Sequence, residues 1–273
     1  MKFLLLISLI VLSGWNTAAK AVELAKNKLV LTGSSTVAPL ALELAKRFEK
    51  LHPGVRIDVQ SGGSSRGISD ARQGLADIGL VSRALRSDES DLSSHTIAMD
   101  GVAVILHRSN PVLTLSKDQL LQIYSGKIKN WQEVGGKQGP IVVVNKAAGR
   151  STLELFAAYL KIKESAIKAD IIIGENEQGI KTVLGNPQAI AYVSIGAAEF
   201  QVKQGAALKI LPLDGVEATG ANVKKGIFPL SRPLNYVLKG PAQGIAKDFI
   251  AFSLSAEADE IIKEQYFVPV SAK

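Results

Sequence analysis

Residues 29–59 read LVLTGSSTVAPLALELAKRFEKLHPGVRIDV, and the order of features in this stretch sets the fold class. An apolar strand at 29–31 leads into a loop of Gly, Ser and Thr, and apolar residues then recur every three or four positions from 37 to 51, as on one face of a helix. His52-Pro53-Gly54 ends that helix, and apolar and polar residues alternate from 55 to 59 as in a half-buried strand. A strand, a helix and a second strand in this order predict an α/β fold.

The same alternation continues along the chain and predicts two lobes. Asn110-Pro111 follows an apolar strand at 101–107, after which a second set of elements begins, and the segments near the end can return to complete the first set. No low-complexity linker separates the sets, so we expect crossing strands between the lobes and no flexible tether. The predicted domains are 22–106 plus 228–273 for one lobe and 107–227 for the other. The other expected elements are strands at 77–81, 141–144 and 234–238 and helices at 68–73, 117–124, 245–254 and 258–264.

The first 21 residues have the features of a secretory signal peptide. A positive charge at Lys2 precedes an apolar run at 3–12, which is shorter than the ~20 residues of a membrane-spanning helix, and Ala19-Lys20-Ala21 fits the A-x-A cleavage pattern. Cleavage there predicts a soluble periplasmic protein that starts near Val22 and has no membrane anchor. The chain contains no cysteine, which excludes disulfides, cysteine nucleophiles and a lipid-bearing N-terminal cysteine.

The charge of the chain fits a small anionic ligand better than a nucleic acid. Removing residues 1–21 takes away Lys2 and Lys20 and no acidic residue, so the formal charge falls from +7 to +5. A mild surplus of this kind raises the encounter rate with small anions, or is simply a solvated basic surface. No dense run of Lys and Arg interleaved with aromatic residues occurs, so we expect no nucleic-acid partner.

Three strand-to-helix loops have a composition suited to binding an anion. They are residues 31–36 (LTGSST), 61–67 (SGGSSRG) and 148–152 (AGRST). Each places backbone N–H groups and hydroxyls at a helix N-terminus, where the helix dipole favours negative charge. For one loop alone, helix capping by Ser or Thr is the simpler explanation. Three such loops in both halves of an α/β chain, beyond the carboxyl ends of strands, predict a shared anion site.

Basic residues near these loops can supply positive charge. Arg66 and Arg83 lie in the first half of the chain, and Lys146 and Arg150 lie in the second. Arginine can donate two parallel hydrogen bonds to a tetrahedral oxyanion, whereas lysine acts as a point charge. Each of the four could instead pair with a surface carboxylate. Arg83 and Arg150 are favoured because each follows or lies within a candidate loop.

The pattern of reactive residues argues against an enzyme. Residues 63–67 match the G-x-S-x-G nucleophile elbow, but a hydrolase of that type needs a histidine further along, and none follows His107. The three histidines, at 52, 95 and 107, form no metal-ligand spacing. Neither the P-loop nor the dinucleotide-binding glycine pattern occurs in the loops. The sequence therefore predicts no catalytic residue, no metal and no cofactor.

A series of short motifs runs through the mature chain. They are 32–39 (TGSSTVAP), 63–68 (GSSRGI), 76–79 (ADIG) with 82–83 (SR), 123–126 (IYSG) with 130–131 (NW), 189–193 (AIAYV), 229–234 (PLSRPL) and 268–270 (VPV). In their order the sequence resembles the periplasmic phosphate-binding proteins of ABC transporters. The resemblance covers nearly the whole mature chain.

This resemblance implies a two-lobe periplasmic-binding-protein fold of type II, with hinge strands and an anion cleft between the lobes. It implies that a monomer captures inorganic phosphate and presents it to an ABC permease in the inner membrane. The phosphate-binding residues that it implies are Ser34, Ser35, Thr36, Ser64, Ser82, Arg83, Lys146, Arg150, Ser151 and Thr152.

Three positions depart from the family pattern and leave the ligand open. Lys146 stands where an arginine is usual, and Arg150 stands where a serine is common. Arg83 stands near a position where many members have an aspartate that accepts the proton of bound phosphate, although a subgroup carries Ser-Arg. Asp77 or Asp100 could supply that acceptor. The alternatives are a binder of another tetrahedral oxyanion, such as sulfate or molybdate, and a surface or signalling protein on the same fold.

Overall fold

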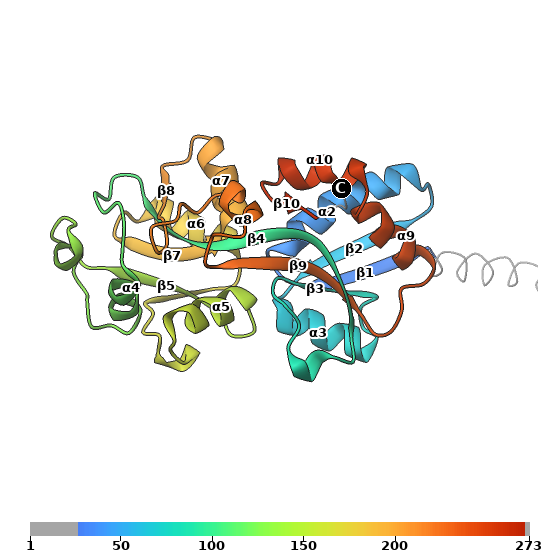
Figure 1. Ribbon diagram of the computed structural model, residues 1–273, viewed down its shortest axis with the longest axis horizontal. Helices are drawn as coiled ribbons and strands as arrows, with labels where there is room; N and C mark the ends of the chain where they lie inside the picture. Colours follow the sequence, from blue (N-terminus) through green and yellow to red (C-terminus); the bar gives the residue numbers. More distant parts are fainter. Residues whose placement is uncertain (1–26, 271–273) are drawn as a thin grey trace, which may run out of the picture.

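The computed structural model describes residues 27–270, whose strands form one mixed sheet with a lobe at each end (Figure 1). The strand order is β2-β1-β3-β9-β4-β7-β5-β6, with β8 and β10 beside β4. Strands alternate with helices along the chain, so the predicted α/β class is confirmed. The predicted signal peptide, residues 1–21, lies outside the described residues.

The first lobe is built on three parallel strands with helices on both faces. Strand β1 pairs in parallel with β2 and with β3, so the carboxyl ends of the three strands lie at one edge. Helices α9 and α10 return near the end of the chain and pack against α2 (Figure 1). A buried apolar core, which includes Leu31, Phe48 and Phe249, joins these helices to the sheet. The elements of this lobe are β1 (Lys28–Gly33), α2 (Val37–Leu51), β2 (Arg56–Ser61), α3 (Ser64–Gln73), β3 (Ile78–Val81), η1 (Ser87–Glu89), α9 (Gly244–Ser253) and α10 (Ala256–Glu264).

Two long strands connect the lobes. Strands β4 (Ser93–His107) and β9 (Ser231–Leu238) are antiparallel neighbours and run side by side between the two groups of elements in Figure 1. Strand β9 also pairs with β3 of the first lobe, whereas β4 continues into pairing with β7 of the second. Their register places Asp100 opposite Arg232, close to the boundary between the lobes.

The second lobe repeats the strand–helix design around a core rich in aromatic residues. Strand β5 pairs in parallel with β6 and with β7. Phe156 stacks on Tyr192 with ring centroids 4.0 Å apart, and Trp131 is buried in the same core. The elements are α4 (Lys117–Tyr124), η2 (Trp131–Val134), β5 (Val142–Lys146), α5 (Ser151–Leu160), η3 (Glu164–Ala166), β6 (Ile171–Ile173), α6 (Asn176–Gly185), β7 (Ala189–Ser194), α7 (Ile195–Lys203), β8 (Leu208–Ile210) and α8 (Gly220–Lys224), and β10 (Val268–Pro269) pairs with β4 between the lobes.

None of the helices in residues 27–270 is long and apolar enough to cross a membrane.

Candidate functional site

The three predicted loops meet where the lobes touch. The backbone N–H groups of Gly62 and Gly63 donate to the carbonyl of Gly33, at 2.7 and 2.8 Å, which joins the two first-lobe loops. The N–H of Ser65 donates to the carbonyl of Gly149 in the second lobe, at 3.2 Å. Gly63 has a φ of 98°, and a Cβ there would lie 2.7 Å from the Gly149 carbonyl oxygen. Glycine at this position therefore allows the lobes to approach closely.

A buried arginine stands at the centre of this meeting point. The side chain of Arg232 on β9 is 0% exposed and forms an ion pair with Asp100 on β4, with 2.8 Å between Nη2 and Oδ2. Its Nε donates to the same carboxylate at 3.1 Å. A buried charge is costly unless it is paired and hydrogen-bonded. The Asp100 partner therefore allows a guanidinium to remain inside the molecule.

The remaining N–H groups of Arg232 donate to three hydroxyls from different segments. Nη2 donates to Thr36 at 3.0 Å, and Nη1 donates to Thr152 at 2.9 Å and to Ser82 at 3.4 Å. Together with the bonds to Asp100, these contacts occupy all five N–H groups of a guanidinium. Arg232 therefore joins the start of α2, the end of β3 and the start of α5.

These contacts fix the direction of the hydroxyl hydrogen bonds. Thr36 Oγ1 accepts from Arg232 and also from Nδ2 of Asn176, at 3.1 Å. Ser82 Oγ accepts from Arg232 and from the Ser34 hydroxyl, at 2.9 Å. A hydroxyl has two acceptor sites and one donor, so both groups keep only their O–H free to donate. A set of converging O–H donors suits an oxyanion.

Lys146, at the end of β5, adds positive charge without a carboxylate partner. It is buried, and its Nζ donates to Oδ1 of Asn176 at 3.0 Å. Within residues 27–270 it takes part in no ion pair. Burial, and after it the positive charge of Arg232, lowers the pKa of Lys146 to about 7. A nearby anion would favour its charged form.

Three of the predicted serines have distinct positions in this cluster. Ser34 Oγ accepts from the N–H groups of Thr36 and Val37 and so caps α2, while Ser64 Oγ accepts from the N–H of Ser82. The hydroxyl of Ser151, at the start of α5, is buried and has no hydrogen-bond partner. Such groups are rare inside proteins and call for a partner.

Three other predicted residues are directed elsewhere. Ser35 is half-buried and lies 3.5 Å from the carbonyl of Gly174. Nη1 of Arg150 lies 3.4 Å from Glu175, which is within ion-pair distance but without hydrogen-bond geometry. Arg83 is buried, and its guanidinium contacts Glu89 and Glu154. None of the three side chains bonds to the hydroxyls around Arg232.

The two carboxylates considered as proton acceptors have different roles. Asp77 accepts from the N–H of Val30 at 2.7 Å and so ties the start of β3 to β1. Asp100 lies in the cluster, but its Oδ2 already accepts twice from Arg232, and its Oδ1 accepts from the N–H of Gly196 at 3.3 Å.

Sequence reasoning did not assign a role to Arg232 or Asn176. The signal for Arg232 is that it is the single charged residue in the segment that forms β9, within the 229–234 motif. The sequence signal for Asn176 is weaker than that for Arg232: Asn176 is a polar residue at the start of a helix, shortly after the short strand β6.

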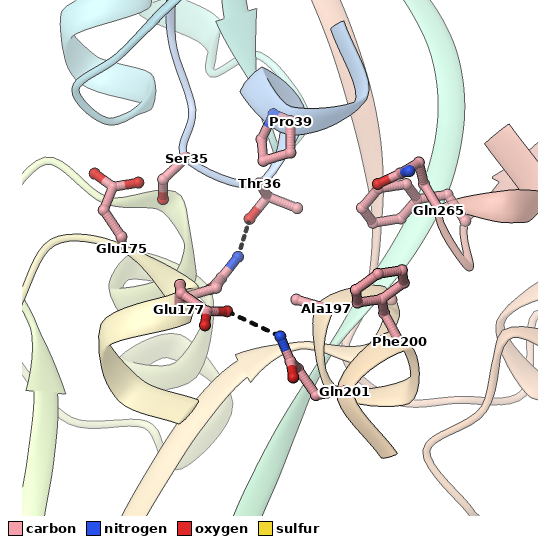
Figure 2. A pocket seen from close by; sticks show the side chains of 12 residues that line it. Ser35, Thr36, Pro39, Glu175, Glu177, Ala197, Phe200, Gln201 and Gln265 are labelled. Atoms are coloured by element: carbon pink, nitrogen blue, oxygen red, sulfur yellow. Dashed lines mark hydrogen bonds between the residues drawn. The ribbon is translucent and has the colours of Figure 1, made fainter. Parts of the chain in front are cut away.

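A pocket of about 370 Å³ lies beside the cluster, between the lobes (Figure 2). Thr36 and Pro39 line it from the first lobe, and Asn176 and Phe200 line it from the second. The hydrogen bond from Asn176 to Thr36 crosses from one lobe to the other at this pocket, as the dashed line at Thr36 in Figure 2 shows. The polar cluster therefore lies in a closed arrangement of the two lobes.

Comparison with known proteins shows which family this architecture matches. The PBP superfamily domain matches residues 18–257. The phosphate-binding protein PstS of Bacillus subtilis (strain 168) is 32% identical, over 93% of this chain and 84% of that protein. A phosphate ABC-transporter substrate-binding protein from Clostridium perfringens, solved with bound phosphate, is 34% identical and has a TM-score of 0.83, covering 89% of this chain and all of that one.

An ABC-type phosphate transport receptor from Vibrio cholerae is 30% identical, with a TM-score of 0.69, and covers 88% of this chain and 99% of that one. These matches confirm the predicted periplasmic-binding-protein fold of type II. The chain therefore belongs to the PBP superfamily and, within it, to the PstS family of phosphate-binding proteins.

Proposed function

We propose that this protein captures inorganic phosphate outside the cytoplasm and presents it to an ABC permease. It belongs to a family of binding proteins, not enzymes, and its C. perfringens relative was solved with bound phosphate. The observation that carries the proposal is the buried Arg232, whose N–H groups hold the hydroxyls of Thr36, Ser82 and Thr152. Four oxygens of phosphate require several donors from different directions, and this cluster supplies them.

The proposed contacts combine the cluster with the residues expected from the sequence. Thr36, Ser82 and Thr152 would donate O–H groups, Arg232 and Lys146 would supply charge, and the free hydroxyl of Ser151 would gain a partner. Ser34 and Ser64 would act by holding Ser82 and the start of α2 in place. Ser35, Arg83 and Arg150 would bind phosphate only if their side chains left their present neighbours.

Binding is proposed to proceed by closure of two lobes, 22–106 plus 228–273 and 107–227, about β4 and β9. The contacts of Thr36 with Asn176 and of Arg232 with Thr152 bring together residues of different lobes, so they would break when the lobes separate. An open form would admit phosphate, and closure would exclude water from it.

The location is proposed from the N-terminal sequence. Cleavage after Ala21 would release a monomeric protein into the periplasm, where it would meet the permease in the inner membrane. Mass spectrometry of the exported protein tests this, since the proposal requires a chain that begins near Val22.

Competition between phosphate and sulfate tests the ligand. Near neutral pH phosphate carries a proton that needs an acceptor, whereas sulfate carries none. The cluster offers mainly donors, and the oxygens of Asp100 are already engaged by Arg232 and Gly196. The relatives are phosphate-binding proteins, so we expect phosphate to bind more tightly than sulfate or molybdate. Because the cluster has no free acceptor, we expect the preference over sulfate to lie below the roughly 10⁴- to 10⁵-fold that a buried acceptor can give.

Competition calorimetry at neutral pH measures this preference. Displacement of phosphate by a large excess of sulfate is the expected result. If sulfate fails to displace phosphate and Asp100→Asn abolishes that selectivity, Asp100 is the proton acceptor and the prediction is wrong. Sulfate or molybdate binding more tightly than phosphate would overturn the proposed function itself.

Proton uptake on binding tests the position of Lys146. Because its pKa in the free protein is about 7, bound phosphate should raise that pKa and draw up to about one proton per site between roughly pH 7 and 9. Calorimetry in buffers of different ionisation enthalpy counts this proton, and Lys146→Met should lack it, whereas the ionisation of phosphate itself is the same for both proteins. Equal proton counts would place Lys146 away from the ligand.

The same residue affects the stability of the free protein. The folded-state pKa of Lys146 lies below the ordinary lysine value of about 10.4, so the unfolded chain binds more protons between roughly pH 7 and 10. Its contribution to the free energy of unfolding therefore increases as pH rises through this window.

A further inference from the structure

A cluster of four charged residues joins the lobes on the side of α3 and α5, away from the pocket of Figure 2. Arg83 and Arg86 follow β3, Glu89 belongs to η1, and Glu154 lies on the first turn of α5. The first three residues belong to the first lobe, and Glu154 belongs to the second. We call this group the Arg83–Glu154 cluster.

Contacts within the first lobe alone hold Arg83, Arg86 and Glu89 in place. Glu89 is 0% exposed and accepts from Nη1 and Nη2 of Arg83, at 2.6 and 2.8 Å. It also accepts from the backbone N–H of Arg86 at 2.9 Å, and the Arg83 carbonyl accepts from Asn235 on β9 at 2.7 Å. The two terminal nitrogens of Arg83 are thus occupied, whereas its Nε is buried without a hydrogen-bond partner within residues 27–270.

Glu154 completes this arrangement from the second lobe. Its Oε2 lies 2.8 Å from Nε of Arg83, which is within ion-pair distance but without hydrogen-bond geometry. The same oxygen accepts from Nη1 of Arg86 at 3.3 Å. The Arg83 side chain is 6% exposed and that of Glu154 is 20% exposed, so solvent screens this ion pair less than one on the open surface. Among the described residues, Glu154 is the second-lobe carboxylate that pairs with either arginine.

The cluster is coupled to the anion site through the chain itself. Arg83 directly follows Ser82, and Glu154 lies two residues after Thr152 on the same turn of α5. The hydroxyls of Ser82 and Thr152 are the two that share Nη1 of Arg232. A movement that separates Glu154 from Arg83 would therefore also separate these two hydroxyls.

We infer that Glu154 is a positioning residue that keeps the lobes closed around bound phosphate through its contacts with Arg83 and Arg86. This inference rests on the proposed function, because it explains how slowly bound phosphate dissociates from the protein. Arg83 then contributes to binding without touching the ligand. Contacts that exist only in the closed form slow dissociation more than they affect association, which occurs in the open form.

The test compares Glu154→Gln with wild type in stopped-flow measurements of phosphate binding. We expect the dissociation rate to rise about tenfold, within the roughly 5- to 150-fold range of typical coupling between sites, with an association rate within about twofold of wild type. Glu154→Asp, which keeps the charge, should recover part of the lifetime. Glu164→Gln is the matched control, because Glu164 borders the same surface depression as Arg86 and Glu154 but forms no ion pair with either arginine.

A second readout does not depend on phosphate. The chain has no cysteine, so Leu75→Cys in the first lobe and Ile172→Cys in the second, both exposed, can carry a pair of spin labels. We expect Glu154→Gln to shift the distance distribution of the ligand-free protein toward longer separations than in wild type. Thermal unfolding of each variant checks that the fold is retained.

The outcomes separate this inference from the proposed function. A dissociation rate within twofold of wild type and an unchanged distance distribution for Glu154→Gln would overturn the inference, as would an equal effect of Glu164→Gln. Failure of wild-type protein to bind phosphate would overturn the proposed function, and the distance distributions alone would then decide whether Glu154 holds the lobes together.

Discussion

Replacement of Arg232 by methionine, combined with Asp100→Asn, should lower the affinity for phosphate roughly 10²- to 10⁴-fold. A hydrogen bond to a charged group contributes about 1.5 to 3 kcal/mol. In the proposed complex, two N–H groups of Arg232 would donate to oxygens of phosphate in place of the hydroxyls of Thr36 and Thr152. The combined loss of about 3 to 6 kcal/mol converts to that factor at about 1.4 kcal/mol per tenfold change. The second substitution is needed because methionine alone would leave Asp100 as an unpaired buried charge, which typically costs about 3 to 5 kcal/mol of stability.

A surface pair provides the matched control for this double variant. Arg72 on α3 and Asp91 form an ion pair at 2.6 Å, and their side chains are 34% and 55% exposed. Arg72→Met with Asp91→Asn therefore removes the same two chemical groups outside the cluster and should change the affinity by less than about twofold, since exposed pairs contribute little. Calorimetric titration of both double variants with phosphate measures the two affinities. An affinity of the Arg232 variant within about fivefold of wild type would show that phosphate binds elsewhere.

The threonines that meet at Arg232 should show the next largest effect. Thr36→Ala and Thr152→Ala should each weaken phosphate binding by about 1.5 to 3 kcal/mol, or roughly 10- to 150-fold, because each removes an O–H donor to a charged ligand. Thr36→Ser and Thr152→Ser keep the hydroxyl and should retain most of the affinity. Titration of the four variants gives these differences directly.

Helix capping predicts a different outcome for the same variants. A threonine that only caps a helix would cost about 1 kcal/mol of stability when replaced by alanine and would leave the affinity unchanged. The structure favours the first outcome, because neither α2 nor α5 has a side-chain cap from the residue at its N-cap, and Ser34 accepts from the first N–H groups of α2. Unchanged affinity for Thr36→Ala and Thr152→Ala would contradict this interpretation.

The sequence predicted the elements whose hydrophobic pattern is long or sharply bounded. The helix expected at 117–124 coincides with α4, and the strand and helix expected from residue 29 to 51 correspond to β1 and α2. The sequence pattern assigns no element to much of the region between 145 and 230. Strands β6 and β8 there have three residues each, which is too short for an alternating pattern to be recognised.

Strand β4 shows why the extent of an element can be underestimated. The sequence pattern predicts only its apolar part, 101–107, whereas the strand begins at Ser93. Apolar and polar residues alternate less clearly in 93–100. This part of the strand is held by its pairing with β9, which lies more than 130 residues away in the sequence. Tertiary pairing of this kind overrides local propensity.

The site shows a similar limit. The hydroxyl-rich loops could be recognised locally, and the structure brings Thr36 and Thr152 together as expected of a shared site. Arg232, the charged residue that joins them, could not be recognised from the local sequence, because its partners lie 80 to 196 residues away along the chain. Arg83 illustrates the converse, since its position beside Ser82 marks it as a candidate, but nothing in the sequence indicates that Glu154 pairs with it.

A crystal structure of the mature protein with bound phosphate tests the central claim most directly. The account predicts phosphate within hydrogen-bond distance of Arg232, Thr36 and Thr152, with Arg83 still paired to Glu89 and Glu154. Phosphate bound to the guanidinium of Arg83, or lodged in the pocket beside Phe200 with the Arg232 cluster unchanged, would contradict it.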